Sequence, residues 1–151
     1  MKKIYGLIFL LSAPLQGVEV KVTSVCNQNK SYVMDFDLDA EKTILDYSIE
    51  LLDSFLLDYQ AYDNGISSIF NSPTATKALE ILPNNSLRSY GWCFLTSSVK
   101  GLPAKMPNEI VVTNQHEKIH WFYAYAESQQ GRWVKFCEPV YKSKPKFICK
   151  Q

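Results

Sequence analysis

The segment 43–58 reads TILDYSIELLDSFLLD and predicts the single long helix around which the rest of the chain is organised. Thr43, with Asp46 three residues later, forms the capping box expected at a helix start. Apolar side chains then recur at spacings of three and four and make a broad face: Leu45, Ile49, Leu52, Leu56 and Tyr59, with Ile44, Tyr47, Leu51 and Phe55 beside them. A face this broad favours packing against a sheet, so we expect a helix over about residues 43–58.

Strand patterns lie on both sides of this helix. Before it, apolar and polar residues alternate over 18–22 and 32–38, as in half-buried strands. After it, segments rich in β-branched or aromatic residues are separated by turn signals: 66–70, 90–99, 110–113, 118–126 and 132–137. Between these, residues 74–82 are expected to form one or two turns of helix. The pattern predicts one α+β domain, in which a mixed or antiparallel sheet is crossed by one main helix.

The N-terminus has the pattern of a secretory signal peptide. Two lysines precede an apolar run at residues 4–11, which is too short to span a bilayer as a helix. Gly17 is a small residue suited to cleavage, and a cut after Ala13 is the alternative. We expect a periplasmic or secreted protein with no membrane contact after cleavage. The predicted parts are a signal peptide at 1–17, one domain at 18–138 and a basic tail at 139–151.

The charges are balanced overall but unevenly placed. The net charge of +1 provides no field that would recruit nucleic acid. Residues 31–86 hold ten acidic and two basic residues, whereas residues 87–151 hold ten basic and four acidic ones. We expect the two regions to face each other. The alternative is an acidic patch that binds a cation or a basic partner.

Four cysteines permit three disulfide pairings. Export favours their oxidation, and none has the short C-x-x-C spacing that is usual in zinc sites. We prefer the pairs Cys93–Cys137 and Cys26–Cys149, because the second would attach the C-terminal tail to the first strand. Spacing alone leaves the other pairings open.

Residues 116–120 read HEKIH, which matches the H-E-x-x-H of zinc hydrolases. In that motif His116 and His120 would bind one zinc ion and Glu117 would act as general base. The chemistry requires a helix, but a turn signal at 114–115 and a strand pattern at 119–126 surround the motif. In an extended chain the two histidines would be about 13 Å apart. We therefore predict no metal ligand and no catalytic residue here, and a helix at this position would reverse that prediction.

Asp35, Asp37 and Asp39, with Asp46 at the twelfth place, mimic a calcium loop. Ala40 replaces the glycine that such a loop needs for its sharp turn, and an aspartate replaces the final glutamate. Alternation instead predicts that the first three carboxylates face solvent while the apolar residues between them point inward.

Four motifs resemble, in the same order, those of the transcobalamin-like C-terminal domain family: 43–46 (TILD), 65–69 (GISSI), 91–92 (GW) and 118–123 (KIHWFY). The chain departs from the family pattern at Ser97-Ser98, where an Asn-Gly turn is usual, and in the extended stretch 71–88. The resemblance implies a β-grasp-like sheet crossed by one helix. In transcobalamins such a domain helps to enclose cobalamin together with a large helical domain, for which residues 18–151 leave no room. The resemblance therefore implies a stand-alone binding or accessory module, and no catalytic residue carries over from it.

The remaining candidate site is a concentration of aromatic residues in the C-terminal half: Trp92, Trp121, Tyr123, Tyr125 and Trp133. Alternation places Trp121, Tyr123 and Tyr125 on one strand face, and His120 and Phe122 on the other. A single helix covers only one face of the sheet. An exposed aromatic face would be a platform for a small molecule, a glycan or a peptide, whereas a covered one would be core, which we favour.

The sequence thus predicts a non-catalytic binding or accessory module without a cofactor. The rival interpretations are a zinc-dependent hydrolase that uses residues 116–120, and a purely structural envelope protein with a buried aromatic cluster.

Overall fold

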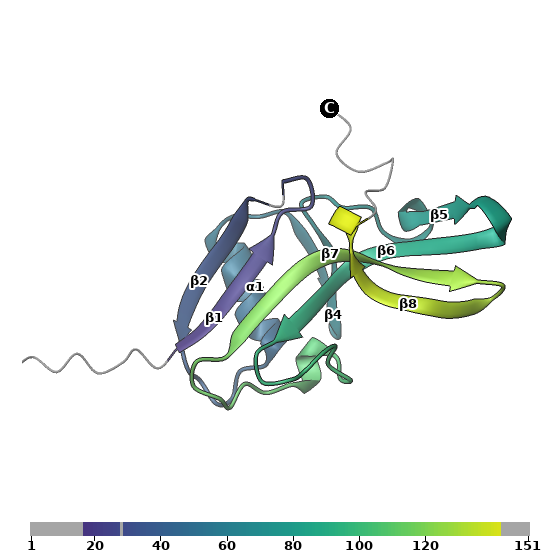
Figure 1. Ribbon diagram of the computed structural model, residues 1–151. Helices are drawn as coiled ribbons and strands as arrows, with labels where there is room; N and C mark the ends of the chain where they lie inside the picture. The colour runs from purple at the N-terminus through teal and green to yellow at the C-terminus, as the bar shows by residue number, and fades with distance from the viewer. Residues whose placement is uncertain (1–16, 28, 143–151) are drawn as a thin grey trace, which may run out of the picture.

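A mixed sheet with one helix across it forms the framework of the protein (Figure 1). The computed structural model describes residues 17–27 and 29–142. The helix α1 spans Ile44–Ser54. The sheet contains β1 (Gly17–Thr23), β2 (Ser31–Asp37), β5 (Leu79–Leu82), β6 (Ser86–Thr96), β7 (Lys118–Gln129) and β8 (Arg132–Pro139). A separate hairpin is formed by β3 (Tyr59–Tyr62) and β4 (Gly65–Ile69).

The strand order of the main path is β2-β1-β7-β6-β5. Its central pair, β1 and β7, is parallel, and the other neighbours are antiparallel. A hairpin, a crossing helix and a later strand parallel to the first make a β-grasp-like arrangement, so the predicted α+β fold is confirmed. The long strand β7 has two partners on one edge: β1 pairs with 118–121, and β8 pairs with 124–129.

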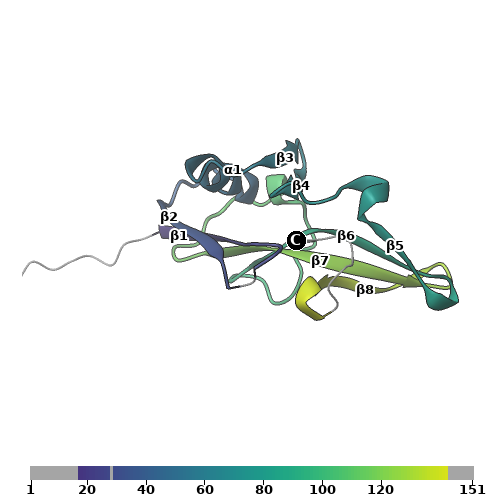
Figure 2. The same cartoon turned by 90° about the horizontal axis from the view of Figure 1, so that it is seen from above.

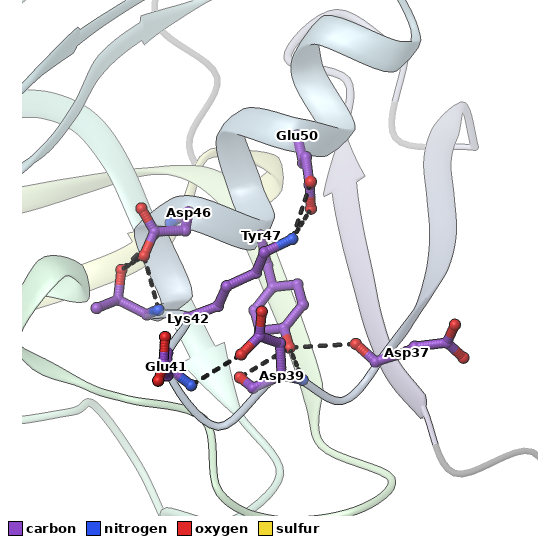
Figure 3. A network of polar contacts seen from close by, with 8 residues as sticks. Asp37, Asp39, Glu41, Lys42, Asp46, Tyr47 and Glu50 are labelled. Atoms are coloured by element: carbon purple, nitrogen blue, oxygen red, sulfur yellow. Dashed lines mark hydrogen bonds and ion pairs between the residues drawn. The ribbon is translucent and has the colours of Figure 1, made fainter.

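The start of α1 is built as the sequence predicts (Figure 3). The backbone N–H of Thr43 donates to the Asp46 carboxylate at 2.8 Å, and the N–H of Asp46 donates to the Thr43 hydroxyl at 3.3 Å. The Tyr47 hydroxyl accepts a bond from the N–H of Asp39 at 2.6 Å and also lies 3.2 Å from the carbonyl oxygen of Asp37. These contacts attach the helix to the end of β2.

The aspartates of the calcium-loop pattern lie around this connection between β2 and α1. Asp35, Asp37 and Asp39 are exposed, as the alternation predicts. Figure 3 shows the Asp37 carboxylate pointing away from Asp39 and Tyr47, while the Asp46 carboxylate caps the helix. Within the described residues, no group of three acidic, histidine or cysteine side chains could hold a metal ion.

The end of α1 differs from the prediction, because the helix stops at Ser54 and not near residue 58. Leu56 has a left-handed φ of 51°, and its N–H donates to the carbonyl of Asp53. The N–H of Leu57 reaches back to the carbonyl of Leu52 at 2.9 Å. This pair of bonds is a Schellman motif, which ends the helix by satisfying its last carbonyls. Tyr59, expected on the helix stripe, consequently belongs to β3.

Two further segments differ from the expected elements. Residues 110–113 do not join the sheet, and only Val111 makes an isolated bridge, to Thr43. The N–H of Ile44 donates to the carbonyl of Ile110, so this segment lies against the helix start. Residues 74–82 form a short 3-10 helix at Ala75–Ala78 and then β5, in place of helix alone.

The main core lies between α1 and one face of the sheet, as the edge-on view shows (Figure 2). It combines the inward residues of β1 with those of α1 and β7: Val18, Val20, Val22, Ile44, Tyr47, Leu51, Leu52, Ile119 and Trp121. The hairpin β3-β4 lies on the helix side in this view. Within the described residues, α1 does not cover the opposite face of the sheet, and we call that face the helix-free face.

One predicted disulfide is present: Cys93 on β6 is bonded to Cys137 on β8, across β7. The other predicted pair falls on Cys149, which lies outside the described residues, as do residues 1–16 of the expected signal peptide and residues 143–151 of the expected tail. No described helix is long and apolar enough to cross a membrane.

The acidic and basic regions meet where β5 pairs with β6, with Glu80 opposite Arg88. Lys42 pairs with Glu50 inside the acidic region. Arg88 and Lys135 both pair with Glu127 inside the basic region.

Candidate functional site

The predicted aromatic platform is for the most part core. Trp121 is 2% exposed, and Tyr123 and Tyr125 are also buried. The indole N–H of Trp121 donates to the Ser48 hydroxyl of α1 at 2.8 Å, so the helix covers this ring. This face is therefore covered, the alternative favoured from the sequence, because α1 and residues 70–78 pack over it.

Of the other two members of the predicted platform, Trp92 contacts Tyr123, with ring centroids 5.4 Å apart, whereas Trp133 lies away from the rest. Trp92 is partly buried, and its indole N–H donates to the Ser72 hydroxyl at 2.8 Å. Trp133 is 48% exposed and lies opposite Ser128 near the end of the β7-β8 hairpin. The five rings therefore do not make one surface.

The HEKIH segment is not helical. His116 lies in a turn with a φ of 67°, and His120 is a residue of β7. The carboxylate of Glu117 accepts bonds from the Ser97 hydroxyl at 2.8 Å and from the Ser98 N–H at 3.0 Å. Burial alone would raise the pKa of Glu117, but the hydrogen bonds from Ser98 and Ser97 outweigh it and lower the pKa. The carboxylate thus holds the loop after β6 in place by hydrogen bonds. The prediction that this motif is not on a helix is confirmed.

A cavity of about 460 Å³ opens on the helix-free face. It lies where the edge of β7 changes partner. The ladder between β1 and β7 ends at Val22 and Trp121, and the ladder with β8 begins only at Ala124 and Pro139. Between these points Phe122 and Tyr123 have no strand partner on that edge within the described residues. The divergence of β1 and β8 leaves the hollow, which we call the β1-β8 cavity.

The lining of the β1-β8 cavity comes from four parts of the chain. β1 and the turn after it contribute four polar residues: Lys21, Thr23, Ser24 and Asn29. The remainder come from β6, from β7, and from the end of β8 with the short 3-10 helix Val140–Lys142 that follows it: Leu95, His120, Phe122, Tyr123, Pro139, Val140 and Tyr141. A volume of this size is within the range of small-molecule sites, which is about 300 to 1,000 Å³.

His120 links the two walls of the cavity. Its Nε2 lies 2.8 Å from the Thr23 hydroxyl, in a hydrogen bond between β7 and β1. Burial lowers the pKa of His120 below its usual value, and the charge of Lys21 lowers it further. The imidazole is consequently neutral near pH 7. No described residue lining the cavity carries a carboxylate that could orient this imidazole as a general base.

A second hollow, of about 280 Å³, lies on the helix side between the β3-β4 hairpin and the loop before Pro107–Glu109. It is lined by Tyr62, Ser67, Trp92 and Met106, among others. It provides a comparison site on the opposite face of the sheet.

Alternation predicted that His120 and Phe122 lie on the face opposite the aromatic stripe, but no sequence pattern identified the cavity. The missing partners, Lys21, Thr23 and Tyr141, are distant in sequence. In the sequence, only the polar residues at the end of the first strand hinted at these partners. They do not indicate which part of β7 lies beside that strand.

Comparison of the chain with protein-family models, curated proteins and solved structures gave no match. The resemblance to the transcobalamin-like C-terminal domain family therefore stays a prediction.

Proposed function

We propose that this protein is an exported, non-catalytic binding module whose ligand is a small molecule held in the β1-β8 cavity. The observation that carries the proposal is the break in strand pairing along β7, which leaves a concave hollow with a polar wall and an apolar wall. Ligand sites combine these features: apolar surface supplies affinity, and a few polar groups fix orientation. A concave site of this size favours a small molecule over a long peptide or glycan.

Export is supported by the signal-peptide pattern of the N-terminus and by the disulfide Cys93–Cys137. The accessory role implied by the family resemblance is compatible with this proposal. We do not propose the zinc hydrolase, because its motif requires a helix and lies in a turn and a strand.

A purely structural role is the second candidate. It is favoured by the burial of Trp121, since the aromatic residues that suggested a platform mostly pack in the core.

Protein-observed NMR with a library of small aromatic and aliphatic compounds separates the two roles. We expect the amide shifts to concentrate at Thr23, Leu95 and Phe122 of the β1-β8 cavity. Tyr141→Ala should weaken that binding, because this exposed ring lines the cavity. Tyr62→Ala is the matched control, since Tyr62 is similarly exposed (66% against 63%) but lines the second hollow. Shifts centred on the second hollow would refute the proposal by placing the ligand elsewhere, whereas no shifts at all would refute it in favour of the structural role.

A further inference from the structure

The polarity of the β1-β8 cavity is divided between its walls. On the β1 side lie an ammonium group, two hydroxyls and an amide, from Lys21, Thr23, Ser24 and Asn29. On the opposite side lie aliphatic and aromatic side chains, from Leu95, Phe122, Val140 and Tyr141 among others. A ligand that satisfies both walls must have one polar end and one apolar body, because burial of either wall against the wrong surface costs free energy.

The charge at the polar wall is positive. Lys21 supplies it, and no described lining residue is acidic. His120 contributes no charge near pH 7, and its Nε2 is already engaged by Thr23. Two residues before Lys21 on the same strand, Glu19 is paired with Lys118 at 3.7 Å. The cavity therefore presents a cation with hydrogen-bonding groups around it.

From these observations we infer that the ligand is a small organic anion, with a carboxylate or similar group at Lys21 and an aromatic or aliphatic body against Phe122 and Leu95. This inference rests on the proposed function and specifies its ligand class. Lys21 would hold the anionic group by a charge-assisted hydrogen bond, and the hydroxyl of Ser24, which also lines the cavity, would donate to one of its oxygens.

Three probes with one ring system test the charge directly: indole-3-acetate, indole-3-acetamide and tryptamine, which carry negative, zero and positive charge near pH 7. The titrations use the exported, oxidised protein and follow the amide shifts of cavity residues. We expect the anion to bind about tenfold more tightly than the amide, the typical scale of one charge-assisted contact, and tryptamine to bind most weakly.

Variants of Lys21 test whether this side chain causes the preference for the anion. Lys21→Met should remove the difference between the anion and the amide, Lys21→Arg should retain it, and Lys77→Met, at an exposed lysine of the short helix Ala75–Ala78, should leave it unchanged. The retained preference of the arginine variant excludes a simple loss of folding as the cause.

The outcomes distinguish the two proposals. If all three probes bind the cavity equally, or if Lys21→Met keeps the preference for the anion, the inference fails and the binding module stands. If none of the probes shifts the cavity residues, the inference fails, and the library screen then decides the proposed function separately.

Discussion

Glu127 is a buried carboxylate that joins three neighbouring strands. On β7, it accepts hydrogen bonds from Arg88 of β6 at 3.0 Å, from Lys135 of β8 at 3.1 Å and from Gln129 at 2.8 Å. The bond from Gln129, followed by those from Lys135 and Arg88, outweighs burial and lowers the pKa of Glu127 to about 2. The folded protein therefore stabilises the ionised form of Glu127 over the protonated form.

The stability of the protein should depend on this carboxylate. Glu127→Gln keeps the size but removes the charge, and we expect the free energy of unfolding near pH 7 to fall by about 2 kcal/mol. Because the pKa in the folded state is lower than the usual value, the stabilisation is complete above about pH 4.5 and is lost as the pH falls toward about 2. When urea unfolding is measured over this pH range, the free energies of unfolding of the wild type and of Glu127→Gln should converge at low pH.

The exposed Glu41 provides the control, since Glu41→Gln should change the free energy of unfolding by less than about 0.5 kcal/mol. A constant difference between wild type and Glu127→Gln from pH 7 down to about 2 would contradict the assignment.

The end of α1 shows how an element can be set by backbone conformation against its own side-chain pattern. Leu56 continues the apolar stripe of the helix in sequence, yet it is 91% exposed, and its φ of 51° is one that non-glycine residues adopt at a cost. The Schellman bonds from Leu56 and Leu57 hold this conformation. The Leu56 side chain thus makes little apolar contact, because the left-handed turn at this residue directs the chain away from the helix and into the β3-β4 hairpin.

Leu56→Gly should stabilise the protein, because glycine adopts this conformation without strain and the leucine side chain makes little packing. We expect the free energy of unfolding to rise by about 0.5 to 1 kcal/mol, the strain relief being partly offset by the greater freedom of the unfolded chain. Chemical denaturation measures the change. Leu56→Ala removes the same side chain but keeps the strain, so it should give no gain; a glycine variant less stable than the alanine variant would disprove this account.

The molecule as a whole has two halves that are stabilised differently. One half is the helix-covered core of β1, β7 and α1. The other is the sheet of β5, β6, β7 and β8 that extends beyond the helix (Figure 2), with a smaller cluster around Tyr90, Tyr123 and Tyr125. The disulfide Cys93–Cys137 lies in this second half and joins its outer strand β8 to β6.

Replacement of both Cys93 and Cys137 by alanine should therefore loosen the second half first. The 44-residue separation corresponds to a loop-entropy contribution of about 4 kcal/mol. Hydrogen exchange should accelerate at β8 before it does at β1, while thermal unfolding shifts to lower temperature. Uniform acceleration along both strands would show that the two halves unfold as one unit.

Much of the fold could be predicted from local signals. The alternation over 18–22, the capping box of Thr43 and Asp46, and the strand pattern that follows HEKIH each depend on residues close in sequence, and each is found as expected. The end of α1 could not be predicted, because no glycine marks the left-handed position at Leu56. The segment 110–113 was misplaced because its strand pattern says nothing of its partner, which is the start of α1.

The candidate site divides in the same way. The sequence by itself determined the alternation that puts Trp121 and Phe122 on opposite faces of one strand, since side chains alternate along any extended chain. Only the tertiary structure decided which face α1 covers, and where the edge of β7 passes from β1 to β8. Both depend on pairing between segments far apart in the chain. The register of such pairing is set by packing of the whole core and not by any local pattern.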